Sequence, residues 1–218
     1  MSVKRLEFRA RLKSLCPDID EKMLQLAKEQ VSAAIARKDI MTLGLYQWGR
    51  QLFLYVEALT DQGMDPETVL PALSPLLSSY PHGEEDRLWA YMYPIFYHAI
   101  PDTESSWQRA KPERRVGRIA LLRHDRLFDY VMHHRALVNE GALQGDRYQF
   151  ISLHEDMLFS YFEEPRTYVN LKNDPSVRST CIDAWTAAVP EAHFQPLPGC
   201  GGQNFLILPE LICMGSND

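Results

Sequence analysis

The chain has 218 residues, of which 45% are apolar, and it carries a formal net charge of −6 with a sequence pI near 5.7. This length allows one large domain or two small ones, and the apolar content is sufficient for hydrophobic cores. The acidic balance argues against a nucleic acid or an anionic membrane surface as a partner.

Targeting and metal-binding signals are weak in this sequence. The N-terminal stretch MSVKRLEFRARLK lacks the apolar region of a signal peptide. No stretch approaches the ~18 apolar residues of a membrane-spanning helix. The four cysteines, Cys16, Cys181, Cys200 and Cys213, show neither C-x-x-C nor metal-ligand spacing. We therefore expect reduced thiols, no metal site and a cytoplasmic location.

The residues Met1–Ile100 predict strands and helices in alternation. The strand LEFRARL precedes a helix from about Asp18 to Lys38, for which Pro17 with Asp18 and Asp20 are a suitable start. Leu43–Glu57 contains two β-rich runs around Gly-Arg, which is typical of a hairpin. After a proline-led segment, EEDRLWAYM with Trp89 is predicted as a helix and Tyr93–Ile100 as a closing strand.

The rest of the chain predicts the same order of elements. Pro101–Arg115 is polar and bounded by proline, as expected of a linker. The strand GRIALL and a helix at Phe128–Glu140 follow it. Tyr148–Glu163 is a second predicted hairpin. The segment STCIDAWTAAV, with Trp185, predicts another helix, and Gln203–Leu211 a final strand.

An internal repeat connects the two halves. The motif LFxYxE occurs at residues 52–57 and again at residues 158–163, an offset of 106. The predicted order is β-α-β-β-α-β, twice, which is the ferredoxin-like pattern of the α+β class. We predict two tandem ferredoxin-like repeats, at residues 1–100 and 116–218, which pack as an intramolecular dimeric α/β barrel with residues 101–115 as the linker.

The helix of the second half carries two polar groups on its apolar side. Leu127, Tyr130, Val131, His134 and Val138 are three or four residues apart and share one face. Burial of a polar group without a partner costs roughly 1–3 kcal/mol. These two side chains therefore either form hydrogen bonds inside a core or face a binding pocket.

The second half resembles the L-rhamnose mutarotase family of small dimeric α/β-barrel sugar isomerases. The resemblance covers about Arg115 to Leu211. It depends on Y-x-x-x-H at Tyr130 and His134, the hairpin end LFSYFE, the helix with Trp185 and the closing LPEL. The first half is similar to the same family more weakly, through RLWAYM.

The resemblance implies an aldose anomer isomerase that interconverts the anomers of a rhamnose-like monosaccharide. His134 and Tyr130 would be the catalytic pair, because imidazole and phenol can exchange protons in general acid–base catalysis. The substrate-binding residues would be Trp185, Tyr148, Trp89 and Tyr46. Such a reaction needs no metal and no cofactor. The chain would be a monomer with an internal pseudo-dimer, or a homodimer.

The sequence also departs from this family and leaves alternatives open. His133 stands where the family has arginine, and the first half has MLQLAK in place of the Tyr–His pair. A non-catalytic barrel protein that binds a small ligand or a protein partner is one alternative. An oxygenase-like barrel enzyme is another, although no cofactor ligand set is visible.

Overall fold

A computed structural model describes residues 2–13, 19–60, 63–82, 85–141, 143–166, 172–173 and 178–218. The chain divides into two compact units. The first comprises Met1–Met92, Pro101–Lys111 and Leu208–Asp218, and the second Tyr93–Ile100 and Pro112–Ile207.

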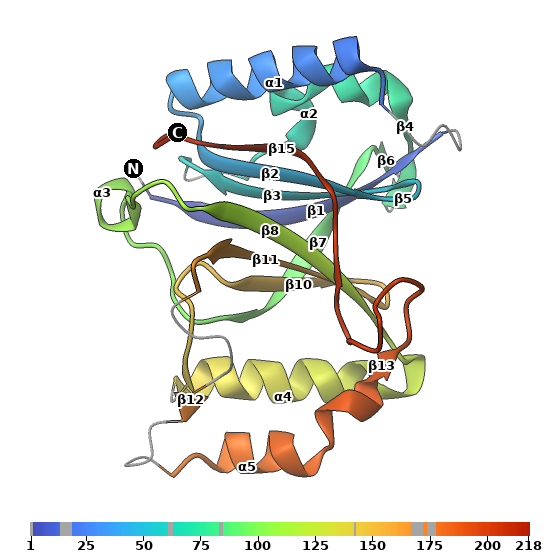
Figure 1. Ribbon diagram of the computed structural model, residues 1–218, viewed down its shortest axis with the longest axis vertical. Coiled ribbons are helices and arrows are strands. Elements are labelled where there is room, and N and C mark those ends of the chain that lie inside the picture. Colours follow the sequence, from blue (N-terminus) through green and yellow to red (C-terminus); the bar gives the residue numbers. More distant parts are fainter. Residues whose placement is uncertain are drawn as a thin grey trace. The chain divides into compact units, whose positions relative to one another are not determined.

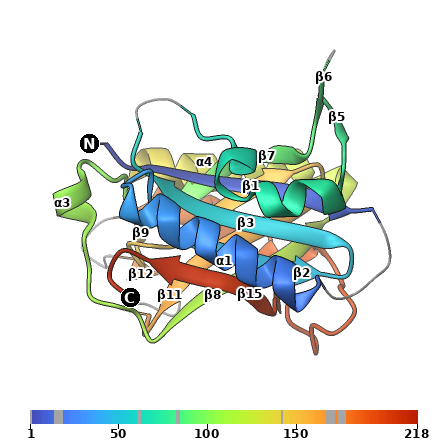
Figure 2. The same ribbon diagram turned by 90° about the horizontal axis from the view of Figure 1, so that it is seen from above.

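The first unit is an antiparallel sheet with a long helix on one face (Figure 1). Its elements are β1 (Lys4–Leu12), α1 (Glu21–Ala36), β2 (Ile40–Trp48), β3 (Gln51–Ala58), α2 (Pro66–Val69), η1 (Pro71–Leu76), β4 (Leu77–Ser78), β5 (Tyr80–His82), β6 (Glu85–Arg87), the start of β7 (Trp89–Tyr97), α3 (Glu104–Trp107) and β15 (Glu210–Gly215). The strand order is β7-β1-β3-β2-β15, and β4 also pairs with β1. Figure 2 shows α1 lying over the strands of this sheet.

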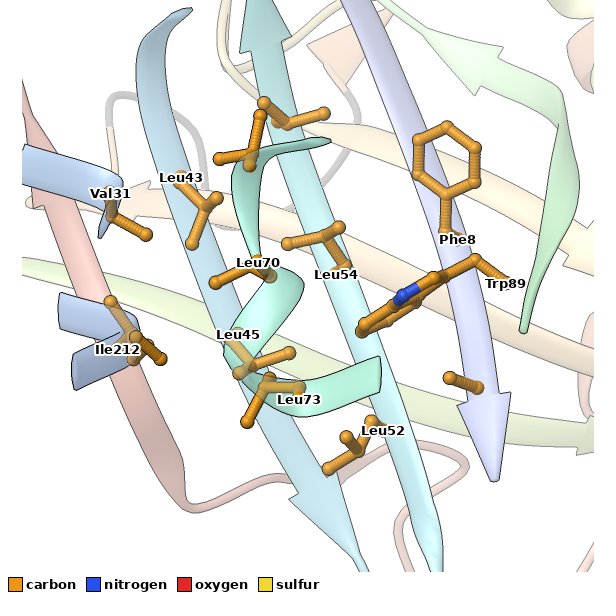
Figure 3. Close-up of a cluster of buried hydrophobic side chains, with 14 of the residues drawn as sticks. Phe8, Val31, Leu43, Leu45, Leu52, Leu54, Leu70, Leu73, Trp89 and Ile212 are labelled. Carbon is orange, nitrogen blue, oxygen red and sulfur yellow. The ribbon is translucent and has the colours of Figure 1, made fainter. Parts of the chain in front are cut away.

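The core of the first unit is formed by apolar residues that alternate along its strands and recur at helical spacing in α1. Alternate residues of β1, among them Phe8 and Ala10, are buried in an apolar cluster. From α1, Ala27, Val31 and Ala34 are buried at helical spacing. Figure 3 shows this cluster, in which aliphatic side chains of the sheet and of α1 meet those of α2 and η1. The helix face of this sheet is therefore lined by hydrocarbon.

The second unit is likewise an antiparallel sheet, with helices α4 and α5 on one side (Figure 1). Its elements are the end of β7, β8 (Arg114–Leu122), η2 (His124–Arg126), α4 (Leu127–Glu140), β9 (Leu143–Gln144), β10 (Phe150–His154), β11 (Met157–Glu164), β12 (Lys172–Asn173), α5 (Thr180–Ala187), η3 (Pro190–His193), β13 (Phe194–Gln195) and β14 (Leu206–Ile207). The strand order is β13-β8-β11-β10-β7, and β14 also pairs with β8.

The α+β class predicted from the sequence is confirmed, because both units combine antiparallel strands with packed helices. The two hairpins, β2–β3 and β10–β11, and the helices α1, α4 and α5 occur where the sequence predicts them. In the described part of the chain, no helix has both the length and the apolar content to cross a membrane.

The predicted helix around Trp89 is wrong. Residues 89–97 form strand β7, in which the β-favouring run WAYMYPIFY pairs with β1 and with β10. The helical turns lie earlier, in the proline-led segment. Pro66 begins α2 and Pro71 begins η1, as expected for a residue whose fixed φ suits the first helical turn.

The observed unit boundaries differ from the predicted ones in three places. Residues 93–100, predicted at the end of the first half, belong to the second unit. Residues 101–111 belong to the first unit, because Trp107 and Arg109 both bond to the buried carboxylate of Glu57. The indole Nε1 of Trp107 donates to Glu57 over 2.8 Å, and Arg109 donates to both carboxylate oxygens. The last strand, β15, pairs with β2 of the first unit, whereas β14 pairs with β8 of the second.

The LFxYxE motif forms the same hydrogen bond in both units. The Tyr55 hydroxyl donates to Glu57 over 2.9 Å, and the Tyr161 hydroxyl donates to Glu163 over 2.7 Å. Both carboxylates are buried, at 0% and 7% exposure. Residues two apart in a strand share a face, so the motif itself sets this contact.

Candidate functional site

Helix α4 places Tyr130 and His134 in the interior of the second unit. Their exposed fractions are 2% and 6%, and their rings stack with centroids 3.9 Å apart. The His134 Nδ1 lies 2.9 Å from the carbonyl oxygen of Tyr130, one helical turn before it. Because a carbonyl can only accept, Nδ1 carries the proton, and Nε2 of the neutral ring is an acceptor.

Trp185 of α5 completes an aromatic cluster with these two residues. Its ring meets His134 edge-on at 4.7 Å and Tyr130 at 5.5 Å. Phe96 of β7 contacts His134 at 5.3 Å, and Phe194 contacts Tyr130 at 5.5 Å. The structure thus brings together Tyr130, His134 and Trp185, as the sequence predicts, and encloses them among further aromatic rings.

Because the two side chains are buried, their pKa values lie away from 7, and neither side chain gains or loses a proton readily at neutral pH. Burial lowers the pKa of His134 to about 4, with the bond to Tyr130 and the nearby His133 and His193 as smaller influences. Burial raises the pKa of Tyr130 above its ordinary value, and the Arg118 charge only partly opposes this. At pH 7 both side chains are neutral hydrogen-bonding groups.

The other predicted substrate-binding residues lie elsewhere. Trp89 and Tyr46 belong to the first unit, where Trp89 is 4% exposed and packs among the core residues shown in Figure 3. The Tyr46 hydroxyl accepts a hydrogen bond from the Cys213 thiol over 3.3 Å. Tyr148, in the second unit, is half-buried before β10, with the guanidinium of Arg147 5.9 Å from its ring centroid.

Arg118 is a site residue that sequence reasoning missed. It projects from β8 to the helix side of the sheet, like Ala120 and Leu122, and it is half-buried. Its guanidinium carbon lies 4.3 Å from the ring centroid of Phe205 and 5.1 Å from that of Phe162. In the strand GRIALL, the arginine occupies an apolar position of the alternation, which is the signal that could have identified it.

Arg118 has little compensation for its charge. Its Nε donates to the Ser160 hydroxyl over 3.4 Å, and among the described residues no carboxylate lies within ion-pair distance of it. Burial, and then the charge of Arg166, lower the pKa of the Arg118 guanidinium to about 10. It therefore remains a cation at neutral pH.

The neighbouring Arg166 has an anionic partner. Its Nε donates to Asp146 over 2.7 Å, and its Nη2 donates to Gln149 over 3.2 Å. Its guanidinium carbon lies 4.7 Å from the Phe162 ring centroid. Phe162 therefore contacts two guanidinium groups, of which only that of Arg166 has a carboxylate partner within the described residues.

A second polar group lies at the start of α4. The buried His193 places Nε2 2.9 Å from Asp129 Oδ2, and its Nδ1 lies 3.2 Å from the carbonyl of Pro190. The bond from His193 is the main reason that the pKa of Asp129 is lowered. His193 joins η3 to α4 and contacts Trp185 at 5.1 Å. This interaction supports the aromatic cluster.

No family model matches the chain, and no curated protein matches it in sequence. Solved structures resemble it over nearly its full length. A candidate monooxygenase from Lactobacillus acidophilus NCFM is 7% identical, with a TM-score of 0.47, over 97% of this chain and 96% of that one. An anthrone oxidase-like protein is 11% identical, with a TM-score of 0.39, over 100% and 94%. A candidate chlorite dismutase is 10% identical, with a TM-score of 0.40, over 100% and 97%.

The resemblance to the L-rhamnose mutarotase family is therefore wrong, and so is the sugar isomerase function predicted from it. No family model matches the chain, that of the L-rhamnose mutarotases included. The enclosed, neutral Tyr130–His134 pair also lacks the poised pKa that anomer exchange would require.

Proposed function

We propose that the second unit binds a small organic anion at Arg118. The observation that carries this proposal is a half-buried guanidinium without a carboxylate partner among the described residues. This is the small-ligand alternative to an isomerase, and the geometry supports binding rather than a particular reaction.

The physical argument concerns the cost of keeping Arg118 in place. A charge that leaves water loses solvation, and this loss is large unless an opposite charge or hydrogen bonds offset it. The Ser160 hydroxyl and the faces of Phe162 and Phe205 offset part of it. A bound anion would supply the missing negative charge, and its oxygens would accept charge-assisted hydrogen bonds from the remaining N–H groups of Arg118.

Tyr130, His134 and Trp185 remain predicted site residues. Phe205 contacts Arg118, and Phe194 lies 5.8 Å from Phe205 and contacts Tyr130. An anion at Arg118 would thus lie at one end of a continuous aromatic cluster. We assign the cluster the task of contacting the apolar part of the ligand.

We further propose that the two units are tandem repeats of one ferredoxin-like plan. When the short strands β4, β5, β6, β9 and β12 are left out and the four core strands of each unit are numbered in chain order, both sheets have the order fourth, first, third, second: β7-β1-β3-β2 and β13-β8-β11-β10. The shared Tyr–Glu hydrogen bond supports a common origin of these sheets.

The binding proposal can be tested by isothermal titration calorimetry with a set of organic anions. Arg118→Gln keeps a polar amide but removes the charge, so at least a 10-fold loss of affinity is expected. Arg123→Gln is the matched control, because Arg123 lies at the surface and pairs with Asp125. Unchanged anion affinity in a folded Arg118→Gln protein would refute the proposal.

A further inference from the structure

Among the described residues around Arg118, the positive charges exceed the paired negative charges by one. Arg166 is already matched by Asp146 at 2.7 Å. His134 is neutral at pH 7, because its buried ring does not take up a proton there. Within the described residues, Arg118 is thus the cation of this cluster that lacks a carboxylate, and a dianion would bring one charge in excess.

The Tyr130 hydroxyl is a second donor in the same aromatic surroundings. Phe205 lies 4.3 Å from the Arg118 guanidinium, and Phe194 contacts both Phe205 and Tyr130. Within the described part of the chain, the Tyr130 hydroxyl makes no hydrogen bond, although the residue is 2% exposed. Because burial keeps this hydroxyl protonated, it can donate to an anion at any pH near neutrality.

The surroundings of the two donors are apolar. The ring of Phe205 contacts the Arg118 guanidinium, and Phe194 contacts both Phe205 and Tyr130. Trp185 contacts Tyr130 edge-on. A carboxylate has two oxygens, which suits a guanidinium donor on one side and a hydroxyl donor on the other. An apolar body attached to it would meet aromatic carbon.

We infer that the ligand of this site is a monocarboxylate with an apolar body, held by Arg118 and by the Tyr130 hydroxyl. The inference rests on the proposed function, since it specifies which anion Arg118 takes. It assigns Tyr130 to carboxylate recognition, in place of proton transfer.

The test compares three probes of similar shape by calorimetry: benzoate, the neutral benzamide and the dianionic phthalate. Benzoate is expected to bind at least 10-fold more tightly than either of the others. Tyr130→Phe should weaken benzoate binding about 10-fold without changing the melting temperature greatly. Tyr93→Phe is the matched control, because Tyr93 is 65% exposed, and it should have no effect.

The outcomes separate the two proposals. Phthalate binding as tightly as benzoate would overturn the monocarboxylate inference alone, and loss of binding in Arg118→Gln would then still support the anion site. Benzamide binding as tightly as benzoate would overturn both proposals, because a neutral ligand brings no charge to Arg118. An unchanged benzoate affinity in folded Tyr130→Phe would overturn the role of Tyr130. If neither benzoate nor phthalate binds the wild-type protein, the anion site itself is refuted. Should Tyr130→Phe not fold, the comparison of the three probes on the wild type still decides the ligand class.

Discussion

The helix-covered interiors of the two units differ at corresponding positions. In the first unit Arg5 lies opposite Glu57, and in the second Arg115 lies opposite Glu163, which aligns the paired strands. Three residues further along, β1 and β3 pair Phe8 with Leu54. At the same step, β8 and β11 pair Arg118 with Ser160.

This difference sets an apolar core in the first unit against a partly polar interior in the second, which fits the binding role proposed for the second unit. Phe8 and Leu54 are members of an apolar core, whereas Arg118 and Ser160 place a cation and a hydroxyl under α4. A hydrocarbon interior contributes about 25 cal/mol per Å² of buried surface. An interior that contains polar groups has less of this stabilisation, and such a loss is expected where a protein binds a ligand.

The largest expected effect comes from placing an arginine in the apolar core of the first unit. Phe8→Arg would place a guanidinium among Leu54, Trp89 and other core side chains of the first unit, with no anion prepared for it. We expect a loss of about 4–5 kcal/mol or failure to fold, because an unpaired buried charge is among the most destabilising changes. Urea denaturation would measure this loss.

A control for this change lies on the surface of the same unit. Leu26→Arg adds the same charge on α1, where the side chain is 45% exposed. It should change the free energy of unfolding by less than about 0.5 kcal/mol. A Phe8→Arg protein as stable as Leu26→Arg would contradict the distinction between the two interiors.

The buried carboxylates of the two units should also differ in their contribution to stability. Glu57 accepts bonds from Tyr55, Trp107 and Arg109, and it holds residues 101–111 against the first unit. Glu57→Gln should cost about 3–5 kcal/mol, because it removes the partner of a buried cation.

Glu163→Gln tests the corresponding position. The Arg115 Nε lies 3.9 Å from Glu163, so this contact is longer than the bonds from Arg109 to Glu57. A smaller loss of about 1–3 kcal/mol is expected. Hydrogen exchange would show which unit opens, and equal losses in the two variants would argue against a special role for Glu57.

The neutral His134 predicts an acid sensitivity that belongs to the second unit. Its pKa is lowered from 6.5 to about 4 by burial, so the folded chain stays unprotonated at this site over that interval. The unfolded chain takes up the proton as pH falls below 6.5. The stability due to neutral His134 is therefore present above pH 6.5 and is lost as pH falls to about 4, by about 3 kcal/mol in total.

Replacement of His134 should remove this acid sensitivity. In His134→Phe, which keeps a ring between Tyr130 and Trp185, stability should fall less between pH 6.5 and 4 than in the wild type. His124→Phe is the control, because the His124 side chain is 82% exposed. A His134→Phe protein with the wild-type acid profile would show that this histidine is not buried in its neutral form.

Local patterns in the sequence predicted much of the fold, but long-range strand pairing was beyond them. Alternation and helical spacing identified both hairpins, α1 and α4. Trp89 was misplaced because an aromatic residue is compatible with a helix or a strand until its partners are known. The pairing of Cys213 with Gly44 joins the chain end to β2, and no local pattern specifies such a partner.

In the candidate site, too, some features could be predicted from local sequence, while others depend on residues that are distant in the chain. The polar pair on the apolar stripe of α4 was visible in the sequence, and Trp185 does lie against it. The burial that makes His134 neutral depends on Phe96 and Trp185, which come from separate elements. Arg118 was detectable as a break in the alternation of β8, but its lack of a carboxylate partner is a property of the folded interior.

The smallest predicted effect is a gain in stability in the second unit. Arg118→Met keeps an unbranched chain between Phe162 and Phe205 and removes the charge, which makes the interior more like that around Phe8. Replacing a buried charged group by an apolar one of similar volume is often neutral or stabilising. We expect the free energy of unfolding to rise by about 1–2 kcal/mol, while anion binding is lost. Thermal melting and calorimetry on one preparation measure both quantities. A Met variant that is less stable than the wild type would mean that Arg118 holds the fold together and is not kept for a ligand.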